Sequence, residues 1–244
     1  MSGALYLPPE KWEFPAEIRG DELRHLAALR LKPGDSVRLL DGQGRIAACV
    51  IEALSRKRAV IQAENIEEFP EPEAKAVIAI AISKASRRGF FLEKAAELGA
   101  WEIWIWRAER SQGKISGDLL ESCRAKLLAG CKQSENPWLP QVRGFNNAEE
   151  TAKTGMECDW RFMPWENEQG LPMLEHQQLG KAGSTIFAIG PEGGITEEEA
   201  EIFTNAGFMS VSLGSRILRC ETAATLCLGL QWWGAQLRER GKIA

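Results

Sequence analysis

The sequence predicts an α/β protein whose mainly parallel sheet is sandwiched by helices, preceded by a small β-rich domain. Short strands and turns dominate roughly the first 65 residues, a pattern typical of a small barrel. Further along the chain, continuous apolar runs alternate with segments of helical periodicity. Between the two patterns, residues 67–75 (EEFPEPEAK) combine acids with two prolines, as in a connector. We therefore expect one domain over residues 1–70 and a second over residues 71–244.

The elements of the first domain follow from its turns. We expect one helix over residues 21–30 and strands over 37–40, 46–51 and 59–61, separated by turns at 32–35 (KPGD), 41–44 (DGQG) and 55–58 (SRKR).

The second domain shows a regular alternation of strands and helices. Residues 77–82 (VIAIAI) form an apolar run typical of a strand covered on both faces. Helical spacing follows up to Gly99, a predicted C-cap. Further strands are expected at 101–106, 159–163, 184–189 and 208–213, with helices at 118–132 and 222–238. This order indicates a mainly parallel sheet, in which ligands gather beyond the carboxyl ends of the strands.

The composition excludes several classes of protein. The net charge of −4 over 244 residues requires no polyanionic partner, so any nucleic-acid surface must be local. No window approaches the roughly 20 apolar residues of a membrane span, and the N-terminus lacks a signal-peptide pattern, so we expect a cytoplasmic protein. Six scattered cysteines and two histidines disfavour zinc and disulfides. We expect buried, reduced thiols and no metal.

A glycine loop, residues 190–194 (GPEGG), follows one predicted strand and precedes a helix. Neither the Lys-Ser/Thr of a P-loop nor a G-x-G-x-x-G pattern is present. Thr196 and Glu199 predict a capping box, and the three glutamates at 197–199 disfavour an anionic ligand. The pattern favours a neutral or cationic ligand, such as a nucleoside, that contacts the backbone. The alternative is a tight turn with Gly193 at positive φ.

A second unusual loop follows the strand at 208–213. Arg216, Arg219 and Glu221 bracket the apolar pair Ile217-Leu218. If this segment merely turns the chain, the arginines are solvated and Glu221 only stabilises the helix start through the helix dipole. Two specialised loops at neighbouring strand ends instead favour a binding site.

Both loops lie in motifs that resemble a known family. IGPEGGITEEEAEIF and SLGSRILRCETAATL, with HLAALRLKPGDSVRLLDGQG, the basic residues 83–88, LEKAAELG and RAERSQ upstream, resemble the 16S rRNA uridine N3-methyltransferase family (ribosomal RNA small subunit methyltransferase E) of the SPOUT superfamily. The resemblance covers most of residues 20–235. It implies a PUA-like N-terminal barrel that helps to hold RNA and a SPOUT-type C-terminal domain with a trefoil knot. It also implies a homodimer that methylates a uridine near the decoding centre of the small ribosomal subunit.

The same resemblance implies a binding site for S-adenosylmethionine. Its walls are expected to be Ile189, Gly190, Pro191, Glu192, Gly193, Gly194, Leu213, Gly214, Ile217, Leu218, Thr222 and Ala223. The reaction is a displacement at the methyl group by uracil N3, which must lose its proton. Arg219 is expected to stabilise charge on the uracil, and Glu221 to orient Arg219 or accept the proton. The rival interpretation is that Arg219 grips a phosphate and Glu221 caps the helix.

Contacts with 16S rRNA are expected from basic residues in the matching segments: Arg19, Arg24, His25, Arg30, Lys84, Arg87 and Arg88. The chain departs from the family pattern at Glu135-Asn136, where a glycine and a basic residue are expected. Two rival functions therefore stay open. One is a SPOUT methyltransferase acting on another RNA or on a ribose oxygen, and the other is a noncatalytic ribosome-assembly factor with the same fold.

Overall fold

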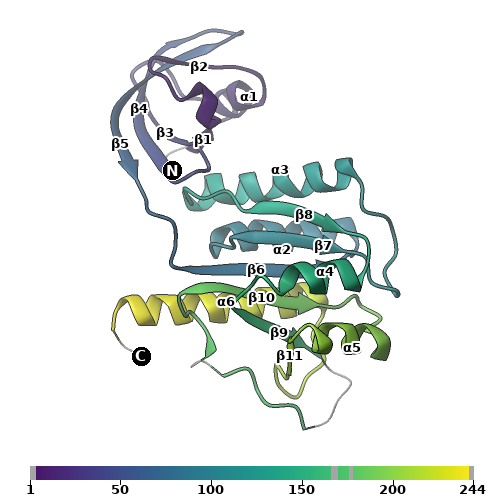
Figure 1. The fold of residues 1–244 in the computed structure, drawn as a ribbon. Coiled ribbons are helices and arrows are strands. Elements are labelled where there is room, and N and C mark those ends of the chain that lie inside the picture. The colour runs from purple at the N-terminus through teal and green to yellow at the C-terminus, as the bar shows by residue number, and fades with distance from the viewer. Residues whose placement is uncertain (1–3, 166–169, 176–177, 242–244) are drawn as a thin grey trace. The chain divides into compact units, whose positions relative to one another are not determined.

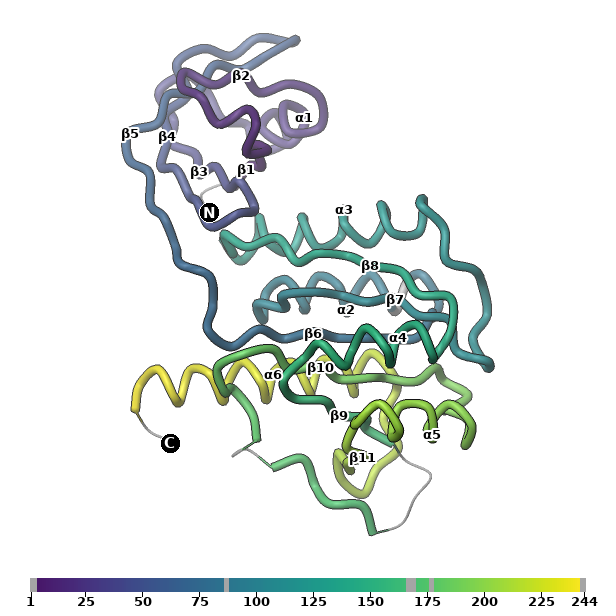
Figure 2. Tube along the Cα trace, in the orientation of Figure 1, coloured from purple at the N-terminus to yellow at the C-terminus, as the bar shows by residue number. Residues whose placement is uncertain are grey.

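The computed structural model describes residues 4–165, 170–175 and 178–241 (Figures 1 and 2). Contacts divide the chain into two compact units, Met1–Glu71 with Leu128–Leu139, and Pro72–Leu127 with Pro140–Ala244. The first boundary, between Glu71 and Pro72, falls within the predicted connector. The segment Leu128–Leu139, however, belongs by its contacts to the first unit, although the sequence analysis assigned it to the second domain.

The first unit is built on one curled five-stranded sheet (Figure 1). In sheet order its strands are β1 (Ala4–Tyr6), β3 (Ser36–Leu40), β4 (Arg45–Leu54), β5 (Ala59–Glu68) and β2 (Ala16–Ile18). Only β1 and β3 pair in parallel. The unit also contains the 3-10 helix η1 (Pro9–Lys11) and the helix α1 (Gly20–Ala28). Leu5, Leu39 and Ile61 are fully buried in its core, as the period-2 pattern of the strands requires.

Two features of this unit differ from the prediction. The sequence did not predict the short strands β1 and β2. Strand β5 continues to Glu68, whereas residues 67 and 68 were expected in the connector. The charged end of β5 stays extended because it pairs with β4, with Ala47 opposite Ile66 and Arg45 opposite Glu68.

The end of the helix α3 (Gly117–Ser134) and the residue after it are held within the first unit by ion pairs. Lys132 Nζ lies 2.8 Å from the carboxylate of Glu22, and Glu135 lies 3.3 Å from Arg38 Nε. Glu135 has φ 55°, in the left-handed region that favours glycine. This backbone conformation explains why a glycine is the residue expected at position 135. In this chain Glu135 occupies the position instead and forms an ion pair with Arg38.

The second unit is an α/β sandwich with a six-stranded, wholly parallel sheet (Figure 1). In sheet order the strands are β11 (Met209–Val211), β9 (Trp160–Pro164), β10 (Gly183–Ile189), β6 (Ala74–Ala81), β7 (Glu102–Trp106) and β8 (Gln141–Phe145). Besides α3, the helices are α2 (Ala85–Glu97), α4 (Ala148–Gly155), α5 (Glu197–Asn205) and α6 (Cys220–Glu239). The predicted α/β class and mainly parallel sheet are confirmed.

Helices cover both faces of this sheet. α4 and α5 lie on one face, and α2 and α6 lie against each other on the opposite face (Figure 1). β6 is buried from Ala76 to its end because both faces are covered. Trp104 and Trp106 are buried in the core, as predicted for two of the three tryptophans assigned to this strand. All six cysteines are buried and free, which confirms the prediction of reduced thiols.

The strand β8 and the helix α4 were not predicted. β8 lies at the edge of the sheet and buries only Phe145, so it lacks a continuous apolar run. α4 is short, but its start carries a readable signal, because the Asn147 side chain accepts a hydrogen bond from the Glu150 amide at 2.8 Å. In the part of the chain that the structure describes, no helix is long and apolar enough to cross a bilayer.

Candidate functional site

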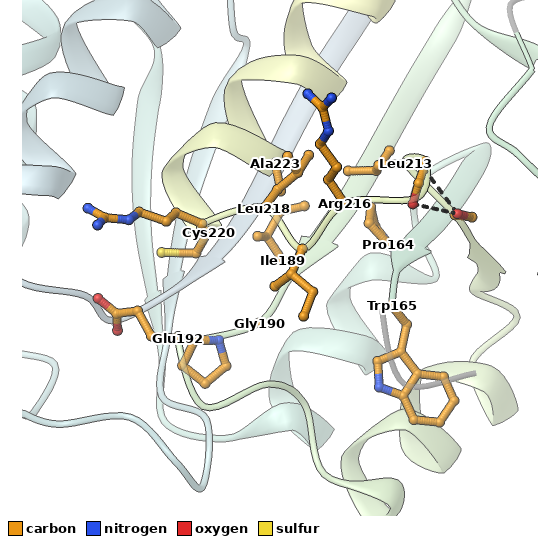
Figure 3. Close-up of a pocket in the computed structure, with 15 residues that line it drawn as sticks. Pro164, Trp165, Ile189, Gly190, Glu192, Leu213, Arg216, Leu218, Cys220 and Ala223 are labelled. Carbon is orange, nitrogen blue, oxygen red and sulfur yellow. Dashed lines mark hydrogen bonds between the residues drawn. The ribbon is translucent and has the colours of Figure 1, made fainter. Parts of the chain in front are cut away.

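Three adjacent strands, β11, β9 and β10, end beside one cavity of about 220 Å³. Figure 3 shows its side chains, which come from the loops after these strands and from the start of α6. We call it the strand-end cavity. It is lined by Pro164, Trp165, Ile189, Gly190, Pro191, Glu192, Ser212, Leu213, Gly214, Arg216, Ile217, Leu218, Arg219, Cys220 and Ala223. The predicted site thus lies beyond the carboxyl ends of the strands, as expected for a parallel sheet.

The glycine loop, residues 190–194, is shaped by close packing of its own backbone. A Cβ on Gly190 would lie 2.6 Å from Ile195 Cγ1 and 3.2 Å from the Ile195 nitrogen, and Ile195 is buried. The Gly194 amide donates to the Pro191 carbonyl at 2.9 Å, and Gly194 has φ 75°. The tight-turn alternative placed a positive φ at Gly193, whereas the turn has it one residue later, at Gly194. Part of the glycine requirement comes from this turn and not from a ligand.

A neighbouring segment, residues 107–111, holds the glycine loop in place, and we call it the bracing loop. The Arg110 guanidinium donates to the Gly193 carbonyl at 2.9 Å. A Cβ on Gly193 would lie 3.1 Å from Arg110 Cβ, so the absent side chain permits this approach. The buried indole of Trp106, at the end of β7, donates to the Ile189 carbonyl at 3.2 Å. These contacts fix both ends of the loop.

Glu199 joins the bracing loop to the start of α5. One oxygen of its buried carboxylate accepts from the Glu109 amide at 2.8 Å, and the other accepts from the Thr196 amide at 3.1 Å. The Glu199 amide donates in return to the Thr196 hydroxyl at 3.2 Å. The predicted capping box is therefore confirmed. Its glutamate also has a second partner, Glu109, that the sequence did not predict.

The segment after β11, residues 212–219, forms the opposite wall, and we call it the arginine loop. Gly214 has φ 116°, and its amide donates to the Ser212 hydroxyl at 3.1 Å. Ile217 is 87% exposed, a high value for an isoleucine, and it faces the cavity. Arg219 is the N-cap residue of α6, so the helix start fixes its backbone. Arg216 and Glu192 extend in different directions from this site (Figure 3).

The thiol of Cys220 is affected by two carboxylates, those of Glu221 and Glu192. This thiol donates to Glu221 Oε2 at 3.2 Å. Burial, followed by this hydrogen bond and by the charges of Glu221 and Glu192, raises the pKa of Cys220 to about 12. The thiol is therefore protonated at neutral pH and is no nucleophile. Both carboxylates act on Cys220, but of the two only Glu192 is among the described residues that line the cavity.

The predicted cofactor residues fall into two groups. Nine line the strand-end cavity, namely Ile189, Gly190, Pro191, Glu192, Leu213, Gly214, Ile217, Leu218 and Ala223, and so does Arg219. Gly193, Gly194 and Glu221 are not among its described lining residues. Thr222 borders a different depression on α6, with Leu98, Thr225, Leu226, Gly229 and Leu230.

The basic residues predicted to bind RNA in the first unit are mostly exposed. Arg19 and Arg24 are 64% and 77% exposed and pair with Glu17 and Asp21. Arg30 is exposed, with φ 58° just after α1. His25 of α1 is half-buried.

The basic residues of the second unit differ from one another. Lys84 is exposed at the N-cap of α2, and the side chain of Arg87 lies outside the described residues. Arg88 is only 9% exposed, and its guanidinium donates to the Ser83 carbonyl at 2.7 Å. This placement corrects the expectation for Arg88, because a buried guanidinium that supports the chain is not presented to a phosphate.

Five residues that line the cavity were not among the predicted site residues: Ser212, Arg216 and Cys220, which lie in or beside the arginine loop, and Pro164 and Trp165, which lie in a different part of the chain. Pro164 is the last residue of β9 and Trp165 follows it, so the end of this strand forms a third wall that the two loop motifs did not indicate. The available signal was topological, since a strand end beside β10 and β11 meets the same edge of the sheet. Among the described residues, no cluster of histidine, cysteine and acidic side chains fits a metal ion.

Comparison with known families identifies both parts of the chain. Residues 70–232 match the RNA methyltransferase domain family, and residues 18–64 match the RNA methyltransferase PUA domain family. A ribosomal RNA small subunit methyltransferase E from a Synechocystis species is 31% identical over 93% of this chain and 76% of its own length. The enzyme of the same name from Mesomycoplasma hyopneumoniae is 30% identical over 84% of this chain and 88% of its own.

Solved structures of similar proteins agree with this assignment. A ribosomal RNA small subunit methyltransferase E from Neisseria gonorrhoeae, bound to S-adenosyl methionine, matches with a TM-score of 0.82 and 26% identity over 94% of this chain and 96% of that one. A probable rRNA methyltransferase from Porphyromonas gingivalis matches with a TM-score of 0.80 and 28% identity over 98% of this chain and all of that one. The chain belongs to the ribosomal RNA small subunit methyltransferase E family.

Proposed function

We propose that this protein transfers the methyl group of S-adenosylmethionine to N3 of a uridine in 16S rRNA. The observation that carries the proposal is the strand-end cavity, which brings together the two loop motifs of the family resemblance. The relatives named above are called small-subunit rRNA methyltransferases, and one was solved with this cofactor. These names supply the substrate and the cofactor for the proposal.

The residues of the cavity fit S-adenosylmethionine chemically. Ile189, Leu218 and Pro164 offer apolar contact for a base, and Gly190 and Gly214 expose backbone for its hydrogen bonds. Glu192 places negative charge at the cavity, which suits a ligand with a sulfonium cation. The volume of about 220 Å³ is below the roughly 300–1,000 Å³ of typical ligand pockets. We therefore expect the ligand to be partly exposed, or covered by a second subunit.

The chemistry requires the removal of the N3 proton and stabilisation of the charge that it leaves. When bound, S-adenosylmethionine supplies a methyl group activated by its positive sulfur. Arg219, exposed at the cavity and fixed at the start of α6, is the residue that we assign to the negative uracil oxygens. Glu221, two residues along the helix, is assigned to orient Arg219 or accept the proton, as the family motif implies.

RNA binding is assigned to the exposed basic residues, chiefly Arg19, Arg24, Arg30 and Lys84. Arg19 and Arg24 already pair with carboxylates, so RNA phosphates must compete for them. Because the substrate is ribosomal RNA, we place the protein in the cytoplasm, where it acts on the small ribosomal subunit.

A homodimer is also part of the proposal. α6 exposes Leu226, Trp232 and Trp233 at 37%, 41% and 55%. A helix with two exposed tryptophans beside a groove at Thr225 and Gly229 suits burial against a second copy. The trefoil knot implied by the family stays a prediction about how this part of the chain is threaded.

A transfer assay with labelled S-adenosylmethionine tests the function. The substrates are small ribosomal subunits and naked 16S rRNA from a strain that lacks the methylation, and Arg219→Ala is the comparison protein. We expect label in the RNA with the wild-type protein and a loss of about 100-fold with Arg219→Ala. Calorimetry with the cofactor tests the noncatalytic rival, because a protein that binds no cofactor would favour the ribosome-assembly factor. Label at a ribose oxygen, located by nucleoside digestion, identifies the related enzyme, as does label in total RNA but not in 16S rRNA.

A further inference from the structure

Trp165 has a hydrogen-bond donor with no acceptor. Its indole nitrogen is buried, and no described residue accepts a hydrogen bond from it. Trp165 also lines the strand-end cavity, and Figure 3 shows its indole below Pro164 with the nitrogen on the side that faces Gly190. A buried donor without a partner costs about 1–3 kcal/mol and is uncommon in folded proteins. Its position therefore requires an explanation.

The ring of Trp165 is held firmly on its other sides. Its backbone amide donates to the Val211 carbonyl at 3.1 Å, which ties it to β11. Part of the indole packs against the core cluster that includes Phe203 and Phe208. The side chain thus has one face in the core and the other at the cavity.

We infer that Trp165 is a ligand-binding residue whose indole N–H donates to an acceptor on the nucleoside part of the methyl donor. This inference rests on the proposed function and adds a positioning and specificity-determining residue to it. The acceptor that it calls for is a ring nitrogen of the base or an oxygen of the ribose, both of which are present on an adenosine.

The neighbours of Trp165 favour the nucleoside over the amino-acid part of the ligand. Pro164, Ile189 and Leu213 form an apolar wall beside it, which suits a flat base. The charged side chains of the cavity, Arg216, Arg219 and Glu192, belong to the other two loops. A carboxylate or an ammonium group of the ligand finds its counter-charges there. The uncharged indole N–H is left for an uncharged acceptor.

The test compares Trp165→Phe, which keeps an aromatic ring and removes the N–H, with wild type in two measurements. The first is the melting temperature without ligand. The second is calorimetric affinity for S-adenosylmethionine, S-adenosylhomocysteine and 5′-methylthioadenosine, the last of which lacks the amino-acid part. Trp12→Phe is the matched control, because Trp12 also has a buried indole nitrogen without an acceptor but lies in the first unit.

We expect Trp165→Phe to melt near the wild-type temperature without ligand, because removal of the unpartnered donor offsets the lost packing of the larger ring, and to bind all three nucleosides about fivefold more weakly. Trp12→Phe should leave all three affinities unchanged. Wild-type affinities in Trp165→Phe overturn the inference while the proposed function stands. A loss confined to the two ligands that carry a carboxylate also overturns it. If wild type itself binds none of the three, the proposed function fails first.

Discussion

The buried carboxylate of Glu199 accepts a hydrogen bond from the backbone amide of Glu109 at 2.8 Å, across 90 residues of sequence. The same carboxylate caps α5 through the Thr196 amide. Glu199 therefore joins the bracing loop to the start of α5, and the bracing loop in turn contacts the glycine loop through Arg110. The rigidity of the proposed cofactor site depends on a residue that is absent from its walls.

Glu199→Gln should damage this arrangement more than loss of the cap alone. The amide of glutamine replaces one acceptor oxygen with a donor, so one backbone N–H loses its partner. We expect unfolding free energy to fall by about 2 kcal/mol and affinity for S-adenosylmethionine to fall severalfold. Thr196→Ala, which removes the cap but keeps the contact with Glu109, should cost about 1 kcal/mol and leave affinity nearly unchanged. Urea unfolding measures the changes in stability, and calorimetry measures the changes in affinity. Equal effects of the two substitutions on affinity would contradict the bracing role of Glu199.

Gly190→Ala tests the packing of the glycine loop. The new Cβ would lie 2.6 Å from Ile195 Cγ1, so the loop or Ile195 must shift. We expect a stability loss of about 1–3 kcal/mol and at least tenfold weaker cofactor binding, measured by calorimetry. Gly117→Ala is the control, because a Cβ at Gly117 meets nothing within 4 Å. Unchanged affinity in Gly190→Ala would show that the loop tolerates movement.

Substitutions of Glu192 and Glu221 should change different steady-state parameters, KM in the first case and kcat in the second. Glu192 lines the strand-end cavity, so Glu192→Gln removes negative charge near the sulfonium and should raise KM for S-adenosylmethionine about fivefold with little change in kcat. Glu221→Gln should instead lower kcat by about tenfold or more, because it acts on Arg219 or on the proton. If Glu192→Gln lowers kcat and Glu221→Gln raises KM, the two assignments are exchanged.

Replacement of Arg88 should affect stability, whereas replacement of Arg24 should affect RNA binding. Arg88→Ala removes the buried hydrogen bond to the Ser83 carbonyl and should lower unfolding free energy by about 2 kcal/mol. Arg24→Ala, at a side chain that is 77% exposed, should change stability by less than about 0.5 kcal/mol. It should weaken rRNA binding and reduce the salt slope of affinity by about one. Filter binding at several salt concentrations checks this, and an unchanged slope argues against a phosphate contact at Arg24.

Buried thiols should make the protein sensitive to alkali. Burial, helped by the charge of Glu64, raises the pKa of Cys49 from 9.0 to about 12. A raised folded pKa contributes stability that is present below pH 9 and is lost as pH rises toward 12. The stability difference between wild type and Cys49→Ala should therefore shrink by about 2 kcal/mol from pH 7.5 to pH 10.5 in urea unfolding. Val37→Ala, at the partner position on β3, should show a constant difference.

The fold was predictable where a single segment carries its own signal. β6, β10 and α6 combine long apolar runs or strong periodicity with clear ends, and their predicted bounds agree with the structure to within a few residues. β8 and α4 lack such a signal, because one is an exposed edge strand and the other spans two turns. The end of β5 is charged and is held extended by its pairing with β4, which only the tertiary structure reveals.

The site was predictable from its glycines and arginines but not from its supports. The two loop motifs line one cavity, although the positive φ belongs to Gly194 and not to Gly193. Arg88 looked like an RNA contact because sequence does not show burial. Trp165 was missed because its role depends on which strand ends meet, and that follows from sheet order. A knot depends in the same way on the path of the whole chain, to which local periodicity is insensitive.

Mass spectrometry of nucleosides tests the central claim most directly. Small ribosomal subunits from a strain without this modification are incubated with the protein and S-adenosylmethionine, and their 16S rRNA is digested completely. We expect N3-methyluridine at close to one per subunit with wild type and almost none with Arg219→Ala. A different methylated nucleoside, or no methylation by a protein that binds the cofactor, would contradict it.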